Sequence, residues 1–457
     1  MKTRSVRAGR HAVAESTVLG TCIVLVLAGC SGAGDSGGSG NEKSVNVLMV
    51  NNPQMLDLEK LTKSNFTKQT GIKVNYTVLP ENDVRDKISQ EFSSQAGTYD
   101  VASISNFEAP IYGVNGWLAP LDDIAEDSAF DQSDILAPIQ EGLTANDGKL
   151  YAEPFYGESS FLMYRKDVFQ AKGLRMPSHP TWAQVEELAA EADGAMPEMK
   201  GICLRGMPGW GQLSGVLTTV VNTYGGTWFT KDWKAQVNGA GFTEATQLYT
   251  NLVRKHGEPG AAQAGFAECL NSFQQGRTAM WYDATSAAGL LETKDSPVAG
   301  KVGYVAAPVN KTKSSGWLYS WAWGIQKASK RQAAAAKFIE WASSKKYEDL
   351  VGARLGWARV PAGKRASTYT NSDYRKAAAP FYQAARDALT SADPRNPGVQ
   401  PRPTVGIQFV AIPEFPDLGT KVSQLIAGVI AGRTTVTAAL NEGQKLAEKV
   451  AAEYAKN

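Results

Sequence analysis

The fold is decided by residues 45–104, which read VNVLMVNNPQMLDLEKLTKSNFTKQTGIKVNYTVLPENDVRDKISQEFSSQAGTYDVASI. Three short apolar runs, at 45–50, 72–79 and 99–104, are rich in β-branched residues and are typical of buried strands. Between them, apolar residues recur every three or four positions, which predicts two helices that each bury one face. This strand–helix alternation predicts an α/β fold with a parallel sheet.

Polar residues follow the first and third of these runs. Ligands of α/β sheets bind beyond the carboxyl ends of the strands, so the loops 51–54 and 105–108 are candidate binding loops. Asn52, Gln54 and Asn106 lie in them and are candidate ligand-binding residues. The alternative is that these side chains only shape the turns in which they lie.

The length and charge of the chain narrow its class. A chain of 457 residues is too long for one compact core and suits two lobes. Its 47 basic and 45 acidic residues give a net charge of +2, without a long basic block. We therefore expect no nucleic acid partner.

The N-terminus predicts export and lipid attachment. The apolar run 18–28 follows basic residues, is too short to span a bilayer, and is typical of a signal peptide. It ends in Leu27-Ala-Gly-Cys30, which resembles a bacterial lipobox. We expect removal of residues 1–29, lipidation of Cys30 at the extracytoplasmic face of the cell membrane, and a flexible tether over residues 30–43. The alternative is an ordinary secretory signal that contains a cysteine.

Cysteine and histidine usage leaves few candidates for catalysis. Beyond residue 30, the only cysteines are Cys203 and Cys269. In an oxidising compartment they form either a disulfide or two buried free thiols, and the sequence leaves both possibilities open. The chain has three histidines and no HExxH, GxSxG or Walker A motif. We therefore predict a protein that is not an enzyme and needs no metal or cofactor.

Two motifs suggest a family. They are the run from Pro154 to Phe169 and the stretch Gly276-Arg-Thr-Ala-Met-Trp281. These motifs, and the order of segments across the chain after the signal, resemble the family 1 extracellular solute-binding proteins of ABC importers, the maltose-binding-protein-like type. The resemblance implies two α/β lobes that close over a ligand by a hinge motion. It also implies a monomer that delivers its ligand to the permease of an ABC transporter.

The same resemblance implies how the chain is divided. The first lobe would contain residues 44–154 and 285–326. The second lobe would contain residues 155–284 and 327–457. Both lobes would then be discontinuous in sequence.

Two further stretches indicate the kind of ligand. They are Gly201-Ile-Cys-Leu-Arg-Gly-Met-Pro-Gly-Trp-Gly211 and Trp317-Leu-Tyr-Ser-Trp-Ala-Trp323, which resemble the mannitol or sorbitol binders of the family. A polyol is uncharged and carries a hydroxyl on almost every carbon, and a buried hydroxyl without a partner costs about 1–3 kcal/mol. Carboxylates, amides and guanidinium groups supply such partners, and aromatic faces cover the C–H surfaces.

Four residues near these motifs match that chemistry. Glu158 and Asp283 are candidate hydroxyl acceptors, and Arg205 and Trp210 flank a glycine-rich bend that would aim both into one cavity. The alternatives are a hinge carboxylate for Glu158, a helix cap for Asp283, a surface arginine and a core tryptophan.

An aromatic strand supplies two more candidates. Alternation places Trp317, Tyr319, Trp321 and Trp323 on one face, more aromatic surface than a ligand cleft needs. Most of these residues would therefore belong to the core, and the family pattern singles out Trp321 as a cleft residue. Trp357 is a further candidate cleft aromatic.

Three other functions compete with polyol binding. One is a receptor for a mono- or disaccharide, whose flat ring favours a tryptophan face. Another is a carbohydrate-active hydrolase that uses Glu158 and Asp283 as paired carboxylates. The last is an adhesive lipoprotein without a small-molecule ligand.

Overall fold

The computed structural model describes residues 43–455. The predicted signal peptide, Cys30 and the tether up to residue 42 lie outside the described residues. Within the described chain, strands form two separate sheets. The strands are β1 Ser44–Val50, β2 Lys73–Leu79, β3 Val101–Ser105, β4 Leu118–Ala119, β5 Glu153–Glu158, β6 Ser160–Arg165, β7 Lys200–Cys203, β8 Thr278–Ala284, β9 Val302–Ala306 and β10 Tyr319–Gln326.

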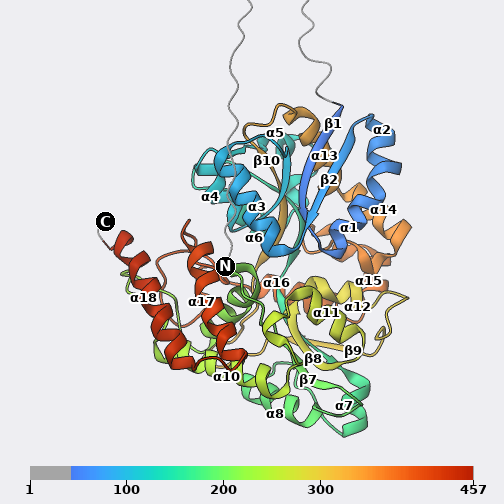
Figure 1. The fold of residues 1–457 in the computed structure, drawn as a ribbon. Helices are drawn as coiled ribbons and strands as arrows, with labels where there is room; N and C mark the ends of the chain where they lie inside the picture. The colour runs from blue at the N-terminus through green and yellow to red at the C-terminus, as the bar shows by residue number, and fades with distance from the viewer. Residues whose placement is uncertain (1–42, 456–457) are drawn as a thin grey trace, which may run out of the picture. The chain divides into compact units, whose positions relative to one another are not determined.

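Helices surround both sheets (Figure 1). They are α1 Pro53–Thr62, α2 Lys68–Thr70, α3 Glu81–Ser94, α4 Glu108–Val114, α5 Asp122–Glu126, α6 Ala137–Leu143, α7 Lys166–Lys172, α8 Trp182–Ala192, α9 Gly215–Thr223, α10 Ala240–His256, α11 Phe266–Gln274, α12 Ala288–Leu291, α13 Gln332–Ser343, α14 Lys345–Leu355, α15 Ser372–Ala377, α16 Tyr382–Ser391, α17 Phe415–Ile430 and α18 Val436–Tyr454. The last two helices, α17 and α18, pack side by side.

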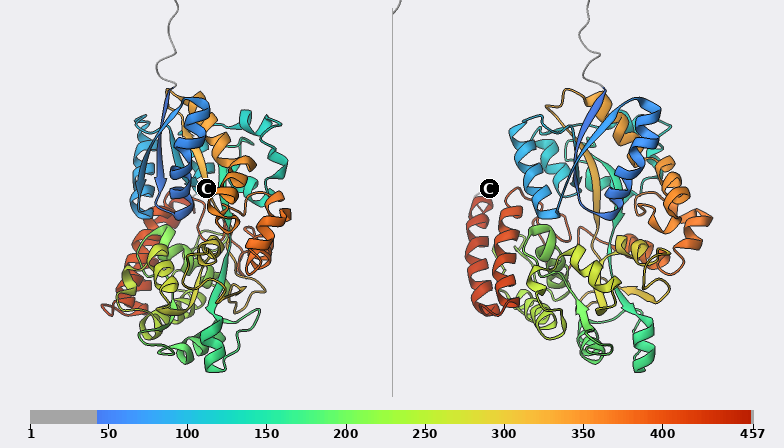
Figure 2. Two further views of the ribbon diagram at one scale, coloured as in Figure 1. Left: turned by 90° about the vertical axis from the view of Figure 1, so that its right-hand side faces the viewer. Right: turned by 45° about the vertical axis from the view of Figure 1, so that its right-hand side comes forward.

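The first sheet grows from the N-terminal apolar runs. Strand β1 lies between β2 and β3 and is parallel to both, which confirms the predicted parallel α/β arrangement. Strand β10 then joins from far along the chain and pairs antiparallel with β3, β4 and β5. Both views in Figure 2 show this strand among the strands of the N-terminal part of the chain.

The second sheet has the order β7-β8-β6-β9. Strand β7 is parallel to β8, whereas β6 is antiparallel to β8 and β9. A disulfide joins Cys203 at the end of β7 to Cys269 in α11, with a Cα–Cα distance of 5.6 Å. Of the two possibilities that the sequence left open for these cysteines, the structure contains the disulfide.

The chain passes from the first sheet to the second at Ser159, between β5 and β6, and returns between β9 and β10. The sheets differ from the predicted division at two segments. Strand β9 pairs with β6 and so belongs to the second sheet, although residues 285–326 were expected in the first lobe. Helix α13 packs on the first sheet, where Phe338 contacts Trp323, although residues 327–457 were expected in the second lobe.

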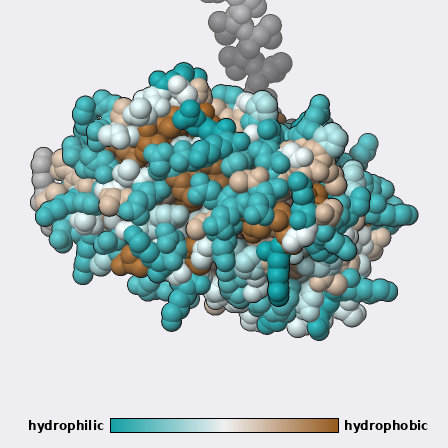
Figure 3. Space-filling model, turned by 90° about the horizontal axis from the view of Figure 1, so that it is seen from below, coloured by the Kyte–Doolittle hydropathy of each residue, from teal (hydrophilic) through white to brown (hydrophobic). Residues whose placement is uncertain are grey.

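Hydrophobic side chains of both sheets are buried in a continuous core. On the face seen from below in Figure 3, the surface is mostly hydrophilic and hydrophobic residues show as separate patches. Every helix within residues 43–455 is too short or too polar to cross a membrane.

Candidate functional site

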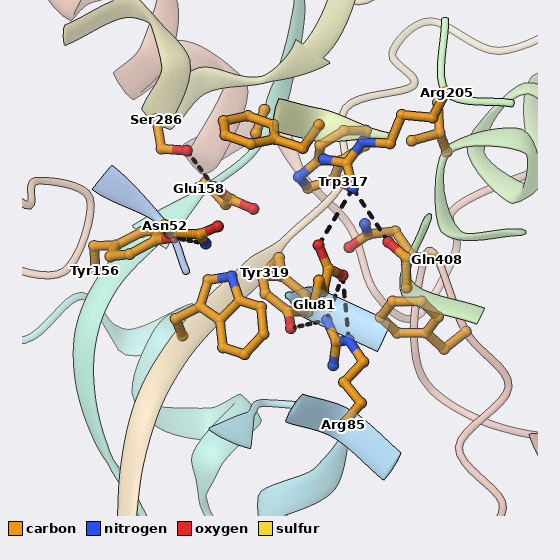
Figure 4. A pocket seen from close by; sticks show the side chains of 16 residues that line it. Asn52, Glu81, Arg85, Tyr156, Glu158, Arg205, Ser286, Trp317, Tyr319 and Gln408 are labelled. Carbon is orange, nitrogen blue, oxygen red and sulfur yellow. Dashed lines mark hydrogen bonds and ion pairs between the residues drawn. The ribbon is translucent and has the colours of Figure 1, made fainter. Parts of the chain in front are cut away.

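A pocket is lined by residues from both sheets (Figure 4). Asn52 and Glu81 follow strands β1 and β2, while Arg205 follows β7 and Ala284 ends β8. The pocket therefore lies at the carboxyl ends of parallel strands, where α/β sheets bind ligands. The full lining is Asn52, Glu81, Arg85, Tyr156, Glu158, Arg205, Gly211, Val216, Phe266, Ala284, Ser286, Trp317, Tyr319, Trp321, Gln408 and Phe409.

Arg205 is fixed by a carboxylate behind it. Its Nε and Nη2 atoms donate to the two oxygens of Asp283 at 2.9 and 2.6 Å. The pairing of Cys203 with Trp281 explains this contact, because two residues further along each parallel strand the side chains meet on the same side. Asp283 also accepts bonds from Trp281 Nε1 and the Ala284 amide. Burial would lower the pKa of Arg205, but the charge of Asp283 outweighs it and raises that pKa above its ordinary value.

Arg85 is enclosed on the opposite wall. Its guanidinium donates to Glu81, one helical turn earlier in α3, and to the Tyr319 hydroxyl at 2.6 Å. Glu108 lies 3.5 Å away, and Trp321 stacks with a distance of 4.6 Å from its ring centre to the Arg85 Cζ atom. Burial alone would lower the pKa of Arg85. The neighbouring Tyr319, Glu81 and Glu108 outweigh this effect and raise that pKa above its ordinary value, so the guanidinium stays charged.

Glu81 connects the two walls. Its Oε2 atom accepts a hydrogen bond from Gln212 Nε2 at 3.0 Å and lies 3.8 Å from Arg205 Nη1. Next to it, Asn82 Nδ2 donates to the carbonyl of Pro208 at 2.9 Å. Polar groups from α3 therefore hold the segment that follows β7 across the pocket.

Glu158 lies at the end of β5, where it pairs in register with Tyr319 of β10. Its Oε2 atom accepts a hydrogen bond from Ser286 Oγ at 2.5 Å. Burial raises the pKa of Glu158 to about 8, although Ser286 and Arg205 each lower it. At neutral pH the side chain is therefore mostly protonated, and it can both donate and accept a hydrogen bond.

The wall beside Glu158 is made by Asn52 and Tyr156. Asn52 Nδ2 donates to the Tyr156 hydroxyl at 2.9 Å. Gln54 Nε2 donates to the carbonyl of Ser286 at 3.2 Å. Gln54 faces a neighbouring cavity, which shares Tyr156 and Ser286 with the pocket.

Strand β10 and the residues before it give the pocket its aromatic wall. Trp317, Tyr319 and Trp321 line it. Trp323 continues the same face but packs in the core against Phe338 of α13. Trp321 lines the pocket as expected, but Trp317 and Tyr319 line it too, although most of this aromatic face was expected to belong to the core.

The structure brings only some of the predicted site residues to the pocket. Those that line it are Asn52, Glu158, Arg205 and Trp321. Those that do not are Gln54, Asn106, Trp210, Asp283 and Trp357.

Two of these residues lie directly behind the pocket wall. Asp283 is fully buried and reaches the pocket only through Arg205. The Trp210 ring centre lies 4.2 Å from the Arg85 Cζ atom, and this ring packs against Phe107. Both residues support a lining side chain and do not line the pocket themselves.

Of the remaining three residues, Gln54 faces the neighbouring cavity, and the other two are engaged elsewhere. Asn106 Oδ1 accepts a hydrogen bond from the Ser320 amide at 3.0 Å, so it ties the loop after β3 to β10. Trp357 packs on Gly352 of α14, away from the pocket. For Asn106, the structure shows a contact to a distant strand, which is neither the predicted ligand contact nor the turn-forming alternative.

The predicted site residues include only four of the sixteen residues that line the pocket. The residues that sequence reasoning missed include Glu81, Arg85, Tyr156, Ser286, Gln408 and Phe409. Glu81 directly follows a predicted strand, so the rule that selected the other two loops would have found it. Gln408 and Phe409 lie in an irregular proline-rich segment without any periodic signal. No group of three or more metal-ligating side chains is placed to hold a metal ion in the described part of the chain.

Comparisons with known proteins agree with this architecture. The model of the family described as bacterial extracellular solute-binding protein matches residues 52–349. A mannitol-binding protein of Pseudomonas aeruginosa is 38% identical over 405 residues, which cover 88% of this chain and 92% of the relative.

Two solved structures resemble the chain over most of its length. A solute-binding protein of Agrobacterium vitis with bound D-mannitol has a TM-score of 0.87 and 45% identity, covering 90% of this chain and 99% of its own. One from Agrobacterium radiobacter in complex with ribitol has a TM-score of 0.78 and 25% identity, covering 89% and 98%. The fold is the two-lobe α/β fold of the maltose-binding-protein-like type. With a family model that spans most of the chain and a relative that matches nearly all of it, the chain belongs to the bacterial extracellular solute-binding proteins.

Proposed function

We propose that the protein binds a linear polyol of the mannitol type in this pocket and delivers it to the permease of an ABC transporter. The observation that carries the proposal is the chemistry of the lining, which combines amides, carboxyls and guanidinium groups with an aromatic wall. The relatives that bind mannitol and ribitol support the same ligand class.

The charges of the pocket favour an uncharged ligand. Arg205 is paired with Asp283, and Arg85 with Glu81 and Glu108. The ion pairs are thus complete without the ligand, which therefore need not supply a charge. Hydroxyl groups match such a site because each can donate to one neighbour and accept from another.

A ligand also gains affinity by forming hydrogen bonds with buried polar atoms that have no partner within the protein. Trp317 Nε1 and Gln408 Oε1 are buried and have no hydrogen-bond partner among the described residues. A buried polar atom without a partner costs about 1–3 kcal/mol, so a ligand that pairs these atoms recovers part of that cost. The aromatic faces of Trp317 and Trp321 would cover the C–H surface of the chain.

We further propose that Cys30 carries a lipid and holds the protein at the extracytoplasmic face of the membrane. The sequence Leu27-Ala-Gly-Cys30 and the Gly/Ser-rich stretch after it support this proposal. Mass spectrometry of the protein from membranes would detect an acylated N-terminal Cys30. A mature protein that begins at another residue would overturn the anchor without affecting the ligand proposal.

Ligand binding is tested by thermal unfolding with mannitol, sorbitol, xylitol, glucose, maltose and trehalose. A ligand at a hundredfold excess over its Kd adds about 2.7 kcal/mol to the free energy of unfolding. We expect the largest shift with a hexitol. A larger shift with glucose or maltose would favour the saccharide alternative, and no shift with any compound would favour an adhesive lipoprotein.

The hydrolase alternative requires Glu158 and Asp283 to face one substrate. Asp283 is fully buried behind Arg205, and both of its oxygens accept hydrogen bonds from the protein. This arrangement does not favour the hydrolase. Recovery of chemically unchanged ligand from the complex would agree with a receptor, and release of a cleaved product would contradict it.

A further inference from the structure

One wall of the pocket comes from a long irregular segment, residues 392–414, between α16 and α17. Arg402 anchors this segment by donating to Asn222 Oδ1 and to the Gly406 carbonyl. In return, Asn222 Nδ2 donates to the Ile407 carbonyl at 2.9 Å. These bonds fix the backbone directly before Gln408.

Phe409 holds the tip of this segment in place. Its ring packs against Trp210 at 5.1 Å and Phe107 at 5.3 Å, both between ring centres. Phe107 follows strand β3, so the tip rests on the first sheet, whereas Asn222 lies in α9. The side chain of Gln408 is therefore presented to the pocket by an anchored backbone on either side.

Gln408 differs from the other amide, carboxyl and guanidinium side chains of the pocket. It is only 7% exposed, and its Oε1 atom has no hydrogen-bond partner among the described residues. Arg205, by contrast, is held by Asp283, Glu158 by Ser286, and Asn52 by Tyr156. Because buried side-chain carbonyls are normally paired, this one points to a group supplied by the ligand.

We propose that Gln408 is a specificity-determining residue that recognises two adjacent hydroxyls of the ligand. This inference rests on the proposed function and deepens it. A carboxamide presents an acceptor oxygen and N–H donors side by side in one plane. One hydroxyl of a vicinal diol donates to Oε1 while its neighbour accepts from Nε2, so the amide pairs with both at once.

This arrangement selects against other ligands of similar size. A ligand that lacks one of the two hydroxyls leaves half of the buried amide unpaired, and such losses discriminate strongly in binding sites. A ligand carboxylate at this position would pair only with the N–H donors and face the Oε1 oxygen. Gln408 thus favours an alditol over its deoxy and acid derivatives.

The test is a ligand-variant cycle measured by titration calorimetry. Wild type, Gln408→Leu and Gln408→Glu are titrated with mannitol and with its monodeoxy derivatives. Gln400→Leu is the matched control, because Gln400 belongs to the same segment and is exposed. We expect Gln408→Leu to raise the Kd for mannitol about 10- to 100-fold, and Gln400→Leu to leave it within about twofold.

The diol contact gives a further signature. For the deoxy derivative that lacks a hydroxyl read by Gln408, wild type and Gln408→Leu should differ much less than for mannitol. If Gln408→Leu lost the same affinity for mannitol and for every deoxy derivative, Gln408 would act only by packing. If the variant bound mannitol with the wild-type Kd, Gln408 would not take part in recognition. Gln408→Glu keeps the shape and loses the donors, so it serves if the leucine variant does not fold. A wild-type protein that binds no polyol would instead overturn the proposed function.

Discussion

Arg205 and Asp283 form a two-bonded ion pair whose carboxylate is fully buried, with only the guanidinium lining the pocket. The pair stands at the ends of neighbouring parallel strands, so the sheet itself sets its geometry. The position of a pocket arginine is thereby tied to the stability of the second sheet.

Removing Asp283 should weaken both folding and binding. In Asp283→Ala the buried guanidinium loses its closest partner, which we expect to lower the free energy of unfolding by about 3–5 kcal/mol. Urea unfolding measures this loss. The control is Asp417→Ala, which breaks the exposed pair with Lys421 and should cost less than about 1 kcal/mol. Similar losses in both variants would contradict the structural importance of the buried pair.

The stability of the protein should fall as the pH rises from about 5 to 8. Burial raises the pKa of Glu158 and that of Glu153 from 4.5 to about 8. In this window the folded protein keeps protons that the unfolded chain releases, so raising the pH lowers the free energy of unfolding. Melting temperatures at several pH values measure the slope. Glu158→Gln and Glu153→Gln should each flatten it, and an unchanged slope in the double variant would refute this origin.

Two tryptophans should respond differently to the same substitution. Trp321 lines the pocket, whereas Trp357 is half-buried and lies outside it. We expect Trp321→Phe to raise the Kd for mannitol about 3- to 10-fold, since a phenyl ring buries less apolar surface against the ligand than an indole ring does. Calorimetry on Trp357→Phe should give the wild-type Kd. A comparable loss in Trp357→Phe would show that the ligand extends beyond the pocket.

Reduction of the disulfide should destabilise the second sheet. Cys203 and Cys269 are separated by 66 positions, and loop entropy assigns such a cross-link about 4 kcal/mol. The double variant Cys203→Ser/Cys269→Ser should lose up to that amount in urea unfolding. A reducing agent should lower the melting temperature of the wild type but not that of the double variant. An equal effect on both proteins would point to another cause.

The elements were predictable where the pattern is local. The three apolar runs of residues 45–104 correspond to β1, β2 and β3. They were predictable because the spacing of apolar residues that distinguishes a strand from a helix is visible within a few neighbouring positions. The position of β10 in the same sheet was not accessible in this way. Its partners Ser105 and Tyr156 lie more than a hundred residues away, and only packing selects them.

The binding residues were predictable where they lie at the ends of predicted strands and have side chains suited to hydroxyl groups. Arg205 and Glu158 carry the residue types that hydroxyl recognition needs, and both line the pocket. Asp283 also has suitable chemistry, but it lies behind Arg205 and does not line the pocket. The register of β7 and β8 decides which of these two residues faces the pocket. Gln408 had no local signal, since its position depends on distant anchors such as Asn222.

The late arrival of β10 has a consequence for how the protein is made. Strand β3 pairs on one side with β1, and its other edge stays open until residues 319–326 have been synthesised. A nascent chain that lacks them exposes unpaired backbone groups and cannot complete its N-terminal sheet. Roughly the first two-thirds of the polypeptide therefore emerge before a native N-terminal sheet can form.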